Sequence, residues 1–400
     1  FGSNKKMKES LFNYRFEYEN QKYIFNTNNN GLIQINNDIF TEEEREYLRV
    51  NRFWVDDNED EIALLEREIN HNIQKRQKEL ELTIALTNYC NFSCVYCYQN
   101  KNEKLMTTEV ANMIIEKIDR ILNDNIFEGI NIHYFGGEPL LNIPVLIYLD
   151  ENIKKITDKI GIVYKAFLTT NGSMLSKELL QKVKFSSIQL TFDGLEKTHD
   201  RLRVSDHFHF KEEIELIENI MNFSQAKVLL RTNICKENKD EIIALHKYIF
   251  EKFGNERIEI NPNRTIKYHQ DDSFEMLSVQ EYVEVAYQIK LLWSEQKGKF
   301  ELPVPRSTPC KFPYGNAYAI SPEGYCTFCS GSMDQEKKYF FDVDIENKKM
   351  FSVRKECKKC NILPLCLGGC IIQYNLRAGA CTYEKYELKN ILISYIKHIS

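Results

Sequence analysis

The chain alternates between short apolar runs and longer segments whose apolar residues recur at helical spacing. In its middle part the apolar runs predict six strands, at 82–86, 130–135, 163–169, 187–192, 226–231 and 257–261. Helical patterns lie between these runs, for example at 107–123 and 177–184. Alternation at this spacing favours βαβ units around a parallel sheet. The spacing alone does not distinguish a partial barrel from a doubly wound sheet.

The first 80 residues carry a different pattern. Residues 16–19, 22–25 and 31–35 predict short strands, and a long charged helix is predicted over 59–80. Thr41, followed by three acidic residues, predicts the capped start of another helix. Two interpretations of this region stay open. It packs against the larger sheet, or it is a docking surface that captures a peptide as an added strand.

Four segments are predicted along the chain. Residues 4–80 form a small α+β domain, and 81–262 form the α/β core. Residues 263–306 form a bridge with a helical pattern over 278–294. Residues 307–400 form a cysteine-rich domain.

Composition narrows the class of protein. The formal net charge of −5, from 53 basic and 58 acidic side chains, gives no case for a nucleic-acid partner. No apolar run approaches the roughly 20 residues of a membrane span, and nothing at the start resembles a secretion signal. We therefore expect no membrane partner and a cytoplasmic location.

The twelve cysteines are unevenly placed. Eleven fall in two groups, within 90–97 and 310–381, and only Cys235 stands apart, where an ordinary buried thiol is expected. Disulfide frameworks belong mostly to small secreted chains, so grouped cysteines in a chain of this size indicate metal sites in a reducing compartment.

Cys90, Cys94 and Cys97 directly follow the predicted strand 82–86. The carboxyl ends of parallel strands are where α/β folds bind ligands. Three thiolates this close can hold three irons of a 4Fe–4S cube and leave the fourth iron open to a cofactor or substrate. Zinc is the alternative, although structural zinc requires four ligands.

The spacing Cys-x3-Cys-x-aromatic-Cys, with Tyr96 as the aromatic residue, resembles the signature of the radical S-adenosylmethionine enzymes. The resemblance implies a partial (β/α)6 TIM-type barrel, with S-adenosylmethionine bound at the open iron. It also implies reductive cleavage of this cofactor to a 5′-deoxyadenosyl radical, which abstracts a hydrogen atom.

Two further motifs follow predicted strands. Gly136, Gly137 and Glu138 come after 130–135, where glycines allow close backbone approach and an acid can accept from an ammonium group. The resemblance implies that this segment holds the amino group of S-adenosylmethionine. Asn171 follows 163–169, and the resemblance implies that it borders the cofactor pocket.

A third motif joins Thr191, Asp193 and Arg203. A hydroxyl and a guanidinium both suit a carboxylate, and the resemblance implies that Thr191 and Arg203 bind the cofactor while Asp193 orients the pocket. Arg201 is an alternative to Arg203 for the same role. His199 is expected to cap or to pack.

The second cysteine group resembles the SPASM domain, which adds auxiliary clusters to radical enzymes that modify peptides and proteins. The resemblance implies ligands for a first auxiliary 4Fe–4S cluster at Cys310, Cys329 and Cys370, and for a second at Cys357, Cys360, Cys366 and Cys381. Cys326 is the candidate fourth ligand of the first cluster; without it, one iron there stays open to substrate. A zinc site at Cys357 and Cys360 taken alone is the alternative.

One departure from the family concerns the base. Ser330 stands where the sulfatase-maturing branch has an aspartate, which makes that activity less favoured. The sequence identifies no catalytic base, although Glu323, Tyr325 and Asp342 lie near.

These observations together predict an oxidoreductase of the radical SAM/SPASM kind, with three 4Fe–4S clusters and S-adenosylmethionine. Its expected partners are a ribosomally made precursor peptide and a reductant such as flavodoxin or ferredoxin. Its expected product is an intramolecular crosslink, a thioether first and a carbon–carbon or carbon–oxygen link next. A peptide epimerase and a maturase that oxidises a protein residue are alternatives. An iron–sulfur electron carrier or a zinc-stabilised binding module is the non-enzymatic alternative, against which the motifs at 136–139 and 191–203 argue.

Overall fold

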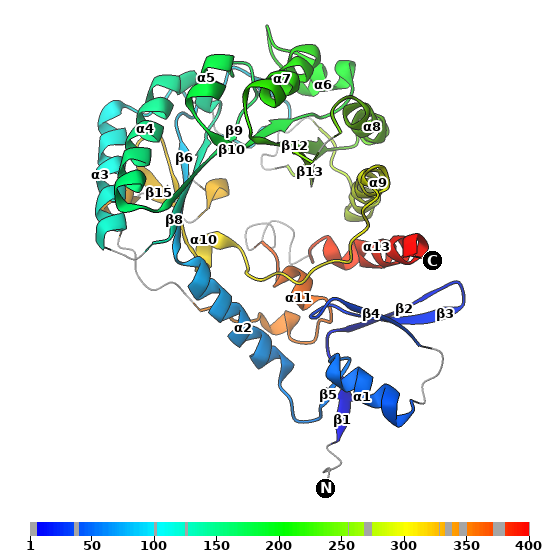
Figure 1. Ribbon diagram of the computed structural model, residues 1–400. Coiled ribbons are helices and arrows are strands. Elements are labelled where there is room, and N and C mark those ends of the chain that lie inside the picture. The colour runs from blue at the N-terminus through cyan, green and yellow to red at the C-terminus, as the bar shows by residue number, and fades with distance from the viewer. Residues whose placement is uncertain are drawn as a thin grey trace. The chain divides into compact units, whose positions relative to one another are not determined.

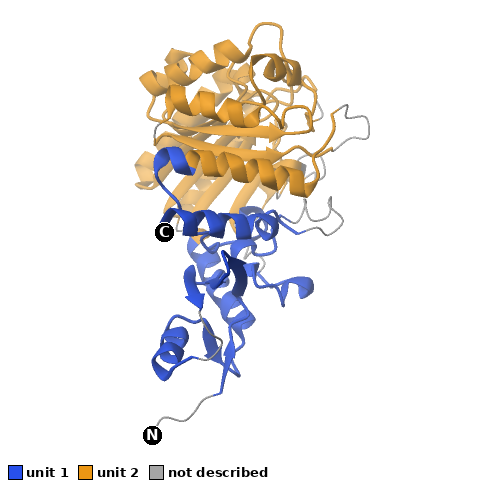
Figure 2. Cartoon of the chain, turned by 90° about the vertical axis from the view of Figure 1, so that its right-hand side faces the viewer, with its two compact units in different colours: residues 1–75, 294–314, 349–400 blue, residues 76–293, 315–348 orange. Residues whose placement is uncertain are grey.

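The structure is a computed structural model that describes most of the chain. The described ranges are 6–35, 40–99, 102–124, 127–254, 256–267, 274–327, 329–332, 338–343, 350–370 and 381–399. The chain divides into two compact units, shown in different colours in Figure 2. One unit joins residues 1–75, 294–314 and 349–400, and the other joins 76–293 and 315–348. Each unit therefore combines segments that lie far apart in the sequence.

The larger unit is built on a parallel sheet. Its six core strands are β6 (Glu79–Ala85), β8 (Gly129–Phe135), β9 (Val163–Thr169), β10 (Phe185–Thr191), β12 (Lys227–Ile234) and β13 (Ile258–Arg264). Each strand pairs in parallel with the next along the chain. The predicted six strands and the partial-barrel fold are thus confirmed.

Helices follow these strands along the chain and lie outside the curved sheet (Figure 1). They are α3 (Thr108–Asp124), α4 (Ile143–Ile160), α5 (Lys177–Lys182), α6 (Glu196–Leu202), α7 (Phe210–Phe223), α8 (Ile242–Phe253) and α9 (Val279–Lys297). Each long connecting helix turns an apolar stripe inward; in α3, Ile114, Ile118 and Ile121 are buried. Burial of such stripes on one sheet face is the main stabilisation of this architecture.

Three later strands extend the same sheet beyond β6. β14 (Asn316–Ile320) pairs in parallel with β6, and β15 (Tyr325–Thr327) and β16 (Lys338–Tyr339) follow as antiparallel strands. All five residues of β14 are buried. The sequence predicts no strand here, because the partner of β14 lies more than 200 residues away along the chain.

The smaller unit contains the N-terminal strands. β2 (Asn13–Tyr18), β3 (Gln21–Asn26) and β4 (Gly31–Ile35) form an antiparallel sheet, as the sequence predicts. β1 (Met7–Glu9) pairs with β5 (Trp54–Asp56). Thr41 caps α1 (Glu42–Val50) with a full capping box, which confirms the predicted helix start.

The same unit holds most of the C-terminal cysteine segment. Its helices are α2 (Glu61–Arg76), α10 (Lys311–Tyr314), α11 (Leu363–Cys366) and α13 (Glu384–Ile399). α2 was predicted to run to residue 80, but it ends at Arg76 because the following residues pair into β6.

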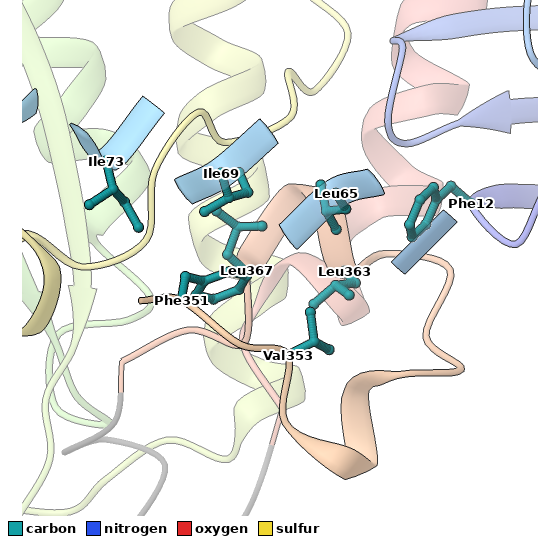
Figure 3. Close-up of a cluster of buried hydrophobic side chains, with 8 residues drawn as sticks. All are labelled: Phe12, Leu65, Ile69, Ile73, Phe351, Val353, Leu363 and Leu367. Atoms are coloured by element: carbon teal, nitrogen blue, oxygen red, sulfur yellow. The ribbon is translucent and has the colours of Figure 1, made fainter. Parts of the chain in front are cut away.

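A single hydrophobic core joins α2 to the cysteine segment. Its buried residues are Phe12, Leu65, Ile69, Ile73, Phe351, Val353, Leu363 and Leu367, which Figure 3 shows interleaved. Hydrogen bonds reinforce it: the Asn70 side chain donates to Phe351 O (2.9 Å) and accepts from Phe351 N (2.7 Å). Glu66 Oε1 accepts from Val353 N (2.6 Å).

Among the described residues, no helix combines the length and apolar character that crossing a membrane requires.

Candidate functional site

Backbone hydrogen bonds join residues 136–139 to the segment that leads into Cys90. Gly137 N donates to Thr87 O (2.9 Å), and Glu138 N donates to Tyr89 O (2.9 Å). A Cβ at Gly136 would lie 2.3 Å from Thr87 O, and one at Gly137 would lie 2.1 Å from Tyr89 O. The backbone contact between these two loops therefore requires both glycines, in addition to any contact with a ligand.

The cysteines themselves lie in a loop held on both sides. Cys94 belongs to β7 (Ser93–Cys94), which pairs antiparallel with β11 (Arg203–Val204), so that Cys94 is opposite Arg203. Cys97 N donates to Cys94 O (3.2 Å). Sulfur also receives N–H donors: Phe92 N lies 3.4 Å from Cys90 Sγ.

The thiol chemistry of this loop suits a metal cluster. Burial raises the pKa of the Cys94 thiol to about 11, so that its thiolate form requires a cation in place of the proton. Among the described residues, no three Cys, His, Asp or Glu side chains are grouped as ligands of a single ion. Three half-buried thiols, one of which, Cys90, receives an N–H donor at its sulfur, fit three corners of an iron–sulfur cube.

The fully buried side chain of Glu138 connects the segment after β8 to the segment after β9. Its Oε1 accepts from Leu140 N (2.9 Å) and from Thr170 Oγ1 (2.7 Å), and its Oε2 accepts from Asn171 N (2.6 Å). Burial raises the pKa of Glu138 to about 7, although these donors act in the opposite direction. Glu138 thus fixes the end of β9 beside the cysteine loop. Its contact with the amino group of the cofactor stays a prediction.

Asn171 continues this connection toward the cysteines. Its Nδ2 donates to Asn91 Oδ1 (2.8 Å) and lies 3.9 Å from Cys90 Sγ. Its Oδ1 accepts from Ser173 N (3.0 Å). The structure therefore places Asn171 directly against the first cysteine.

Asp193, Tyr96 and Arg203 also converge. Asp193 is fully buried; its Oδ1 accepts from Asn233 N (2.7 Å), and its Oδ2 accepts from the Tyr96 hydroxyl. Arg203 Nη1 donates to the Tyr96 hydroxyl oxygen (3.4 Å), and the guanidinium lies 5.4 Å from the centre of the Phe92 ring. Arg203 Nε is buried and has no hydrogen-bond partner among the described residues. Such an orphaned cationic donor fits the carboxylate of a bound ligand.

Thr191 and Cys235 lie close to this group in the fold. Thr191 ends β10 and pairs in register with Arg231 of β12. Cys235 is buried with Leu202 and Phe274, and Tyr96 packs against this cluster. The expectation that Cys235 is an ordinary buried thiol agrees with this packing.

The C-terminal cysteines are divided between the two units. Cys326 and Cys329 belong to the larger unit, and the six others from Cys310 to Cys381 belong to the smaller one. Cys326 is buried in β15, and Gly331 N donates to Cys329 Sγ (3.3 Å). Ligation of a first auxiliary cluster by Cys310, Cys326, Cys329 and Cys370 stays a prediction.

The second set has surroundings that suit thiolates. Leu367, Gly368 and Gly369 all have left-handed backbones, with φ of 46°, 83° and 69°, and they turn the chain sharply after Cys366. Burial raises the pKa of Cys366 to about 11, while hydrogen bonds from the Gly368 backbone and the Thr382 side chain act against this rise.

Cationic side chains lie beside two cysteines of the second set, Cys357 and Cys381. Lys385 Nζ lies 3.8 Å from Cys381 Sγ. Burial raises the pKa of Cys357, and the charge and hydrogen bond of Arg354 act against this rise. Four thiolates would give an iron–sulfur cluster net negative charge, which these groups complement. The residues present therefore fit the predicted cluster.

The sequence did not point to some neighbours of the candidate site, and no catalytic base is evident among the described residues. Asn91 was not singled out, although its place beside Cys90 could have marked it. Asn238 carries no sequence signal, yet its Nδ2 donates to Asp193 O (2.8 Å). Of the acids and phenols near Ser330, Glu323 pairs with Lys104, and the hydroxyls of Tyr325 and Tyr339 lie 2.8 Å apart.

Comparison with known proteins gives a family for this region. Residues 84–249 match the family model described as the Radical SAM superfamily. An uncharacterized protein of Methanocaldococcus jannaschii, MJ0907, is 34% identical over 119 residues, covering 29% of this chain and 39% of that protein. The radical SAM cyclopropyl synthase TigE of Paramaledivibacter caminithermalis is 24% identical over 372 residues, covering 82% of this chain and 76% of TigE. The chain thus spans about two fifths of one relative and three quarters of the other.

Solved structures share the fold over a larger part of the chain. The anSMEcpe protein with bound AdoMet and the Cp18Cys peptide superposes with a TM-score of 0.61 at 18% identity, covering 80% of this chain and 98% of that one. Streptococcus suis SuiB bound to the precursor peptide SuiA gives a TM-score of 0.54 at 16% identity, covering 92% and 97%. At such identities the likeness concerns the fold alone.

Proposed function

We propose, from the premise that residues 84–249 are a radical SAM domain, that this chain modifies a ribosomally made peptide by removing a hydrogen atom from one of its carbons. The observation that carries the proposal is the pairing of Cys94 with Arg203, together with the hydrogen bond from Tyr96 to Asp193. These contacts bring the cysteine loop and the candidate cofactor-binding residues into one site.

Each residue has an assigned part. Cys90, Cys94 and Cys97 would hold the 4Fe–4S cluster. The S-adenosylmethionine site would be formed by Tyr96, Gly136, Gly137, Glu138, Asn171, Thr191, Asp193 and Arg203. When bound, this pair of groups supplies a 5′-deoxyadenosyl radical that abstracts hydrogen. The chain's own contribution is geometric: Arg203 offers its free Nε to a carboxylate, and Asn171 and Glu138 fix the loops on either side.

The C-terminal cysteines support an oxidative outcome. With two auxiliary clusters added, the protein would contain three 4Fe–4S clusters, and the auxiliary pair would accept an electron from the substrate. We assign a thioether as the product. In that reaction the substrate carbon would lose a hydrogen atom to the radical, the thiol would lose a proton, and one electron would pass to an auxiliary cluster. The peptide therefore becomes lighter by two hydrogens.

A carbon–carbon bond is the second candidate product. It is favoured by the similarity to the cyclopropyl synthase TigE, which extends over 82% of this chain. The electron and hydrogen balance is the same as for the thioether, but both atoms joined are carbon.

The partners follow from this assignment. SuiB and anSMEcpe were solved with peptides bound, and the N-terminal sheet β2–β4 of this chain offers edges on which a precursor peptide could add as a strand. A reductant such as flavodoxin or ferredoxin, in a reducing cytoplasm, would supply the electron that starts the reaction.

The test is the intact mass of a synthetic peptide that copies a short reading frame adjacent to the gene. The peptide is incubated anaerobically in heavy water with the reconstituted, reduced protein and S-adenosylmethionine. Loss of two hydrogens supports an oxidative crosslink. No oxidation with one deuterium on carbon would mean epimerisation and would overturn the crosslink. Iodoacetamide then separates the two candidates, because a thioether consumes a cysteine thiol and a carbon–carbon link does not.

A second measurement does not depend on the peptide. Reduced wild-type protein should release 5′-deoxyadenosine from S-adenosylmethionine, and the triple substitution of Cys90, Cys94 and Cys97 by alanine should not. Continued release by the triple variant would contradict the assignment of these cysteines.

A further inference from the structure

Two buried titratable side chains lie behind the candidate cofactor site and have no part in the chemistry above. His199, on α6, and Glu213, on α7, expose 2% and 0% of their surface. His199 Nε2 lies 3.1 Å from Glu213 Oε2. Burial of a charged group is costly unless something compensates it, so a pair this deep in the fold calls for an explanation.

The other face of His199 meets the end of β10. Asp193 N points to His199 Nδ1 at 3.5 Å, which makes Nδ1 the acceptor of a long hydrogen bond. His199 Nε2 faces the Glu213 carboxylate, whose two oxygens have no hydrogen-bond partner among the described residues. The rings of Phe192 and Phe210 both pack against that of His199, with centroids 5.6 Å away, and they lie 5.9 Å from each other. This packing and the contacts of the two ring nitrogens fix the orientation of the histidine.

Asp193, whose N–H points to His199, contacts several residues of the candidate site. The carboxylate of Asp193 accepts from Tyr96 and from Asn233 N, and the following Gly194 has φ of 154°. A Cβ at Gly194 would lie 2.5 Å from Glu241 Oε1, so this turn tolerates no side chain without rearrangement. A small shift of the Asp193 backbone would therefore move its carboxylate relative to Tyr96.

The helix of His199 also leads directly into Arg203. α6 ends at Leu202, Leu202 O accepts from Val95 N (3.0 Å), and Arg203 then pairs with Cys94. Fixing His199 between β10 and α7 thus fixes the register of the cysteine loop on β11.

We infer that His199 and Glu213 are positioning residues, which hold Asp193 and Arg203 in the geometry that binds the amino-acid end of S-adenosylmethionine. This role rests on the proposed function, since it concerns the same cofactor site.

The experiment compares two ligands on the anaerobically reconstituted full-length protein. S-adenosylmethionine carries the carboxylate expected at Arg203, and 5′-methylthioadenosine lacks it. Glu213→Gln replaces the carboxylate with an amide of the same shape. His199→Asn keeps an acceptor near Asp193 N but loses the contact with Glu213. Calorimetry should show about tenfold weaker binding of S-adenosylmethionine to each variant, with the affinity for 5′-methylthioadenosine changed less than about twofold.

The control is Glu237→Gln. This substitution removes the ion-pair partner of Arg201, an exposed residue of α6. Its affinities should equal those of the wild type, and all variants should bind equal amounts of iron. A merely structural role of the pair would weaken both ligands equally or neither, and either result overturns the inference. If the wild type binds no S-adenosylmethionine, the proposed function itself falls.

A measurement on the wild type covers the case in which the variants do not fold. Hydrogen exchange of the amides in 192–203 should slow at least about threefold when S-adenosylmethionine is added, because the clamped segment closes on the ligand. Exchange that stays unchanged while the ligand is bound would overturn the positioning role.

Discussion

Arg203 and Cys94 are direct partners in a two-stranded antiparallel ladder, so the residue predicted to bind a carboxylate is fixed to the loop predicted to bind iron. The ladder is a backbone contact and survives a change of the arginine side chain. Ligand binding and cluster binding can therefore be separated by mutation at this position.

Arg203→Gln should weaken the binding of S-adenosylmethionine by about 10- to 100-fold, while iron content stays at the wild-type level. A hydrogen bond to a charged group contributes about 1.5–3 kcal/mol, which corresponds to that range. Calorimetry and iron analysis measure the two quantities. Arg201→Gln, at an exposed ion pair on the preceding turn, is the control and should leave both unchanged. Equal losses in the two variants would return Arg201 to consideration.

Gly137→Ala should disturb the 4Fe–4S cluster proposed at Cys90, Cys94 and Cys97, the primary cluster, before it disturbs the fold. The added Cβ would lie 2.1 Å from Tyr89 O, a backbone atom of the segment that leads into the cysteines, so that segment must move. The protein should lose about four irons per chain, the content of one 4Fe–4S cluster.

The control for this substitution is Gly161→Ala, at the end of α4. Its Cβ would meet nothing within 4 Å, but φ of 81° strains any side chain there by about 1 kcal/mol. It should lower thermal stability slightly and keep all the iron. A Gly137→Ala protein with full iron would show that the loop contact is dispensable.

Several residues of the candidate site could be placed near one another from the sequence because they follow strands. The apolar runs locate the six strands, and their carboxyl ends necessarily meet at one edge of a parallel sheet. Cys90, Glu138, Asn171 and Asp193 could be brought together on that basis. The contact between His199 and Glu213 could not be predicted, because the sequences of α6 and α7 carry no signal about which of their faces meet.

The sequence also could not predict which distant segments come together in each of the two units. β14 joins the sheet beside β6, and α2 shares a core with Phe351 and Val353, through contacts that span more than 200 residues. No local periodicity encodes such a partner. The end of α2 at Arg76 was misjudged for a related reason, since pairing of β6 on both sides overrides helical propensity.

His246 should make stability depend on pH. It is fully buried, its Nδ1 accepts from Trp293 Nε1 (3.1 Å), and its Nε2 lies 3.1 Å from Thr232 Oγ1. Burial lowers its pKa to about 4. The folded state therefore keeps His246 neutral, whereas the unfolded state takes up a proton below about pH 6.5. The stability contribution is complete above about pH 6.5 and is lost as the pH falls toward 4.

Urea unfolding from pH 7 to pH 5 measures this effect. His246→Asn retains an acceptor for Trp293 and removes the titration, so the wild type should lose up to roughly 2 kcal/mol more than the variant between those pH values. The acidic residues contribute equally to both proteins and cancel in the difference. Parallel curves for the two proteins would mean that His246 becomes protonated without unfolding.

Loading of the proposed second auxiliary cluster should stabilise the N-terminal sheet. Cys360 packs against two buried clusters of the smaller unit: one contains Phe12 and α2, and the other contains Phe16 and Phe25 of the sheet. A ligand that binds only the folded arrangement of these cysteines stabilises whatever folds with it. Hydrogen exchange of residues 13–35 should therefore be at least tenfold faster in a Cys360→Ala protein than in the wild type.

Cys97→Ala, which affects the primary cluster in the other unit, should leave exchange of 13–35 unchanged. If both variants accelerate exchange of this sheet equally, iron loss acts through general destabilisation, and the shared core does not transmit the effect. If neither does, the strands that could receive a precursor peptide fold independently of the cluster.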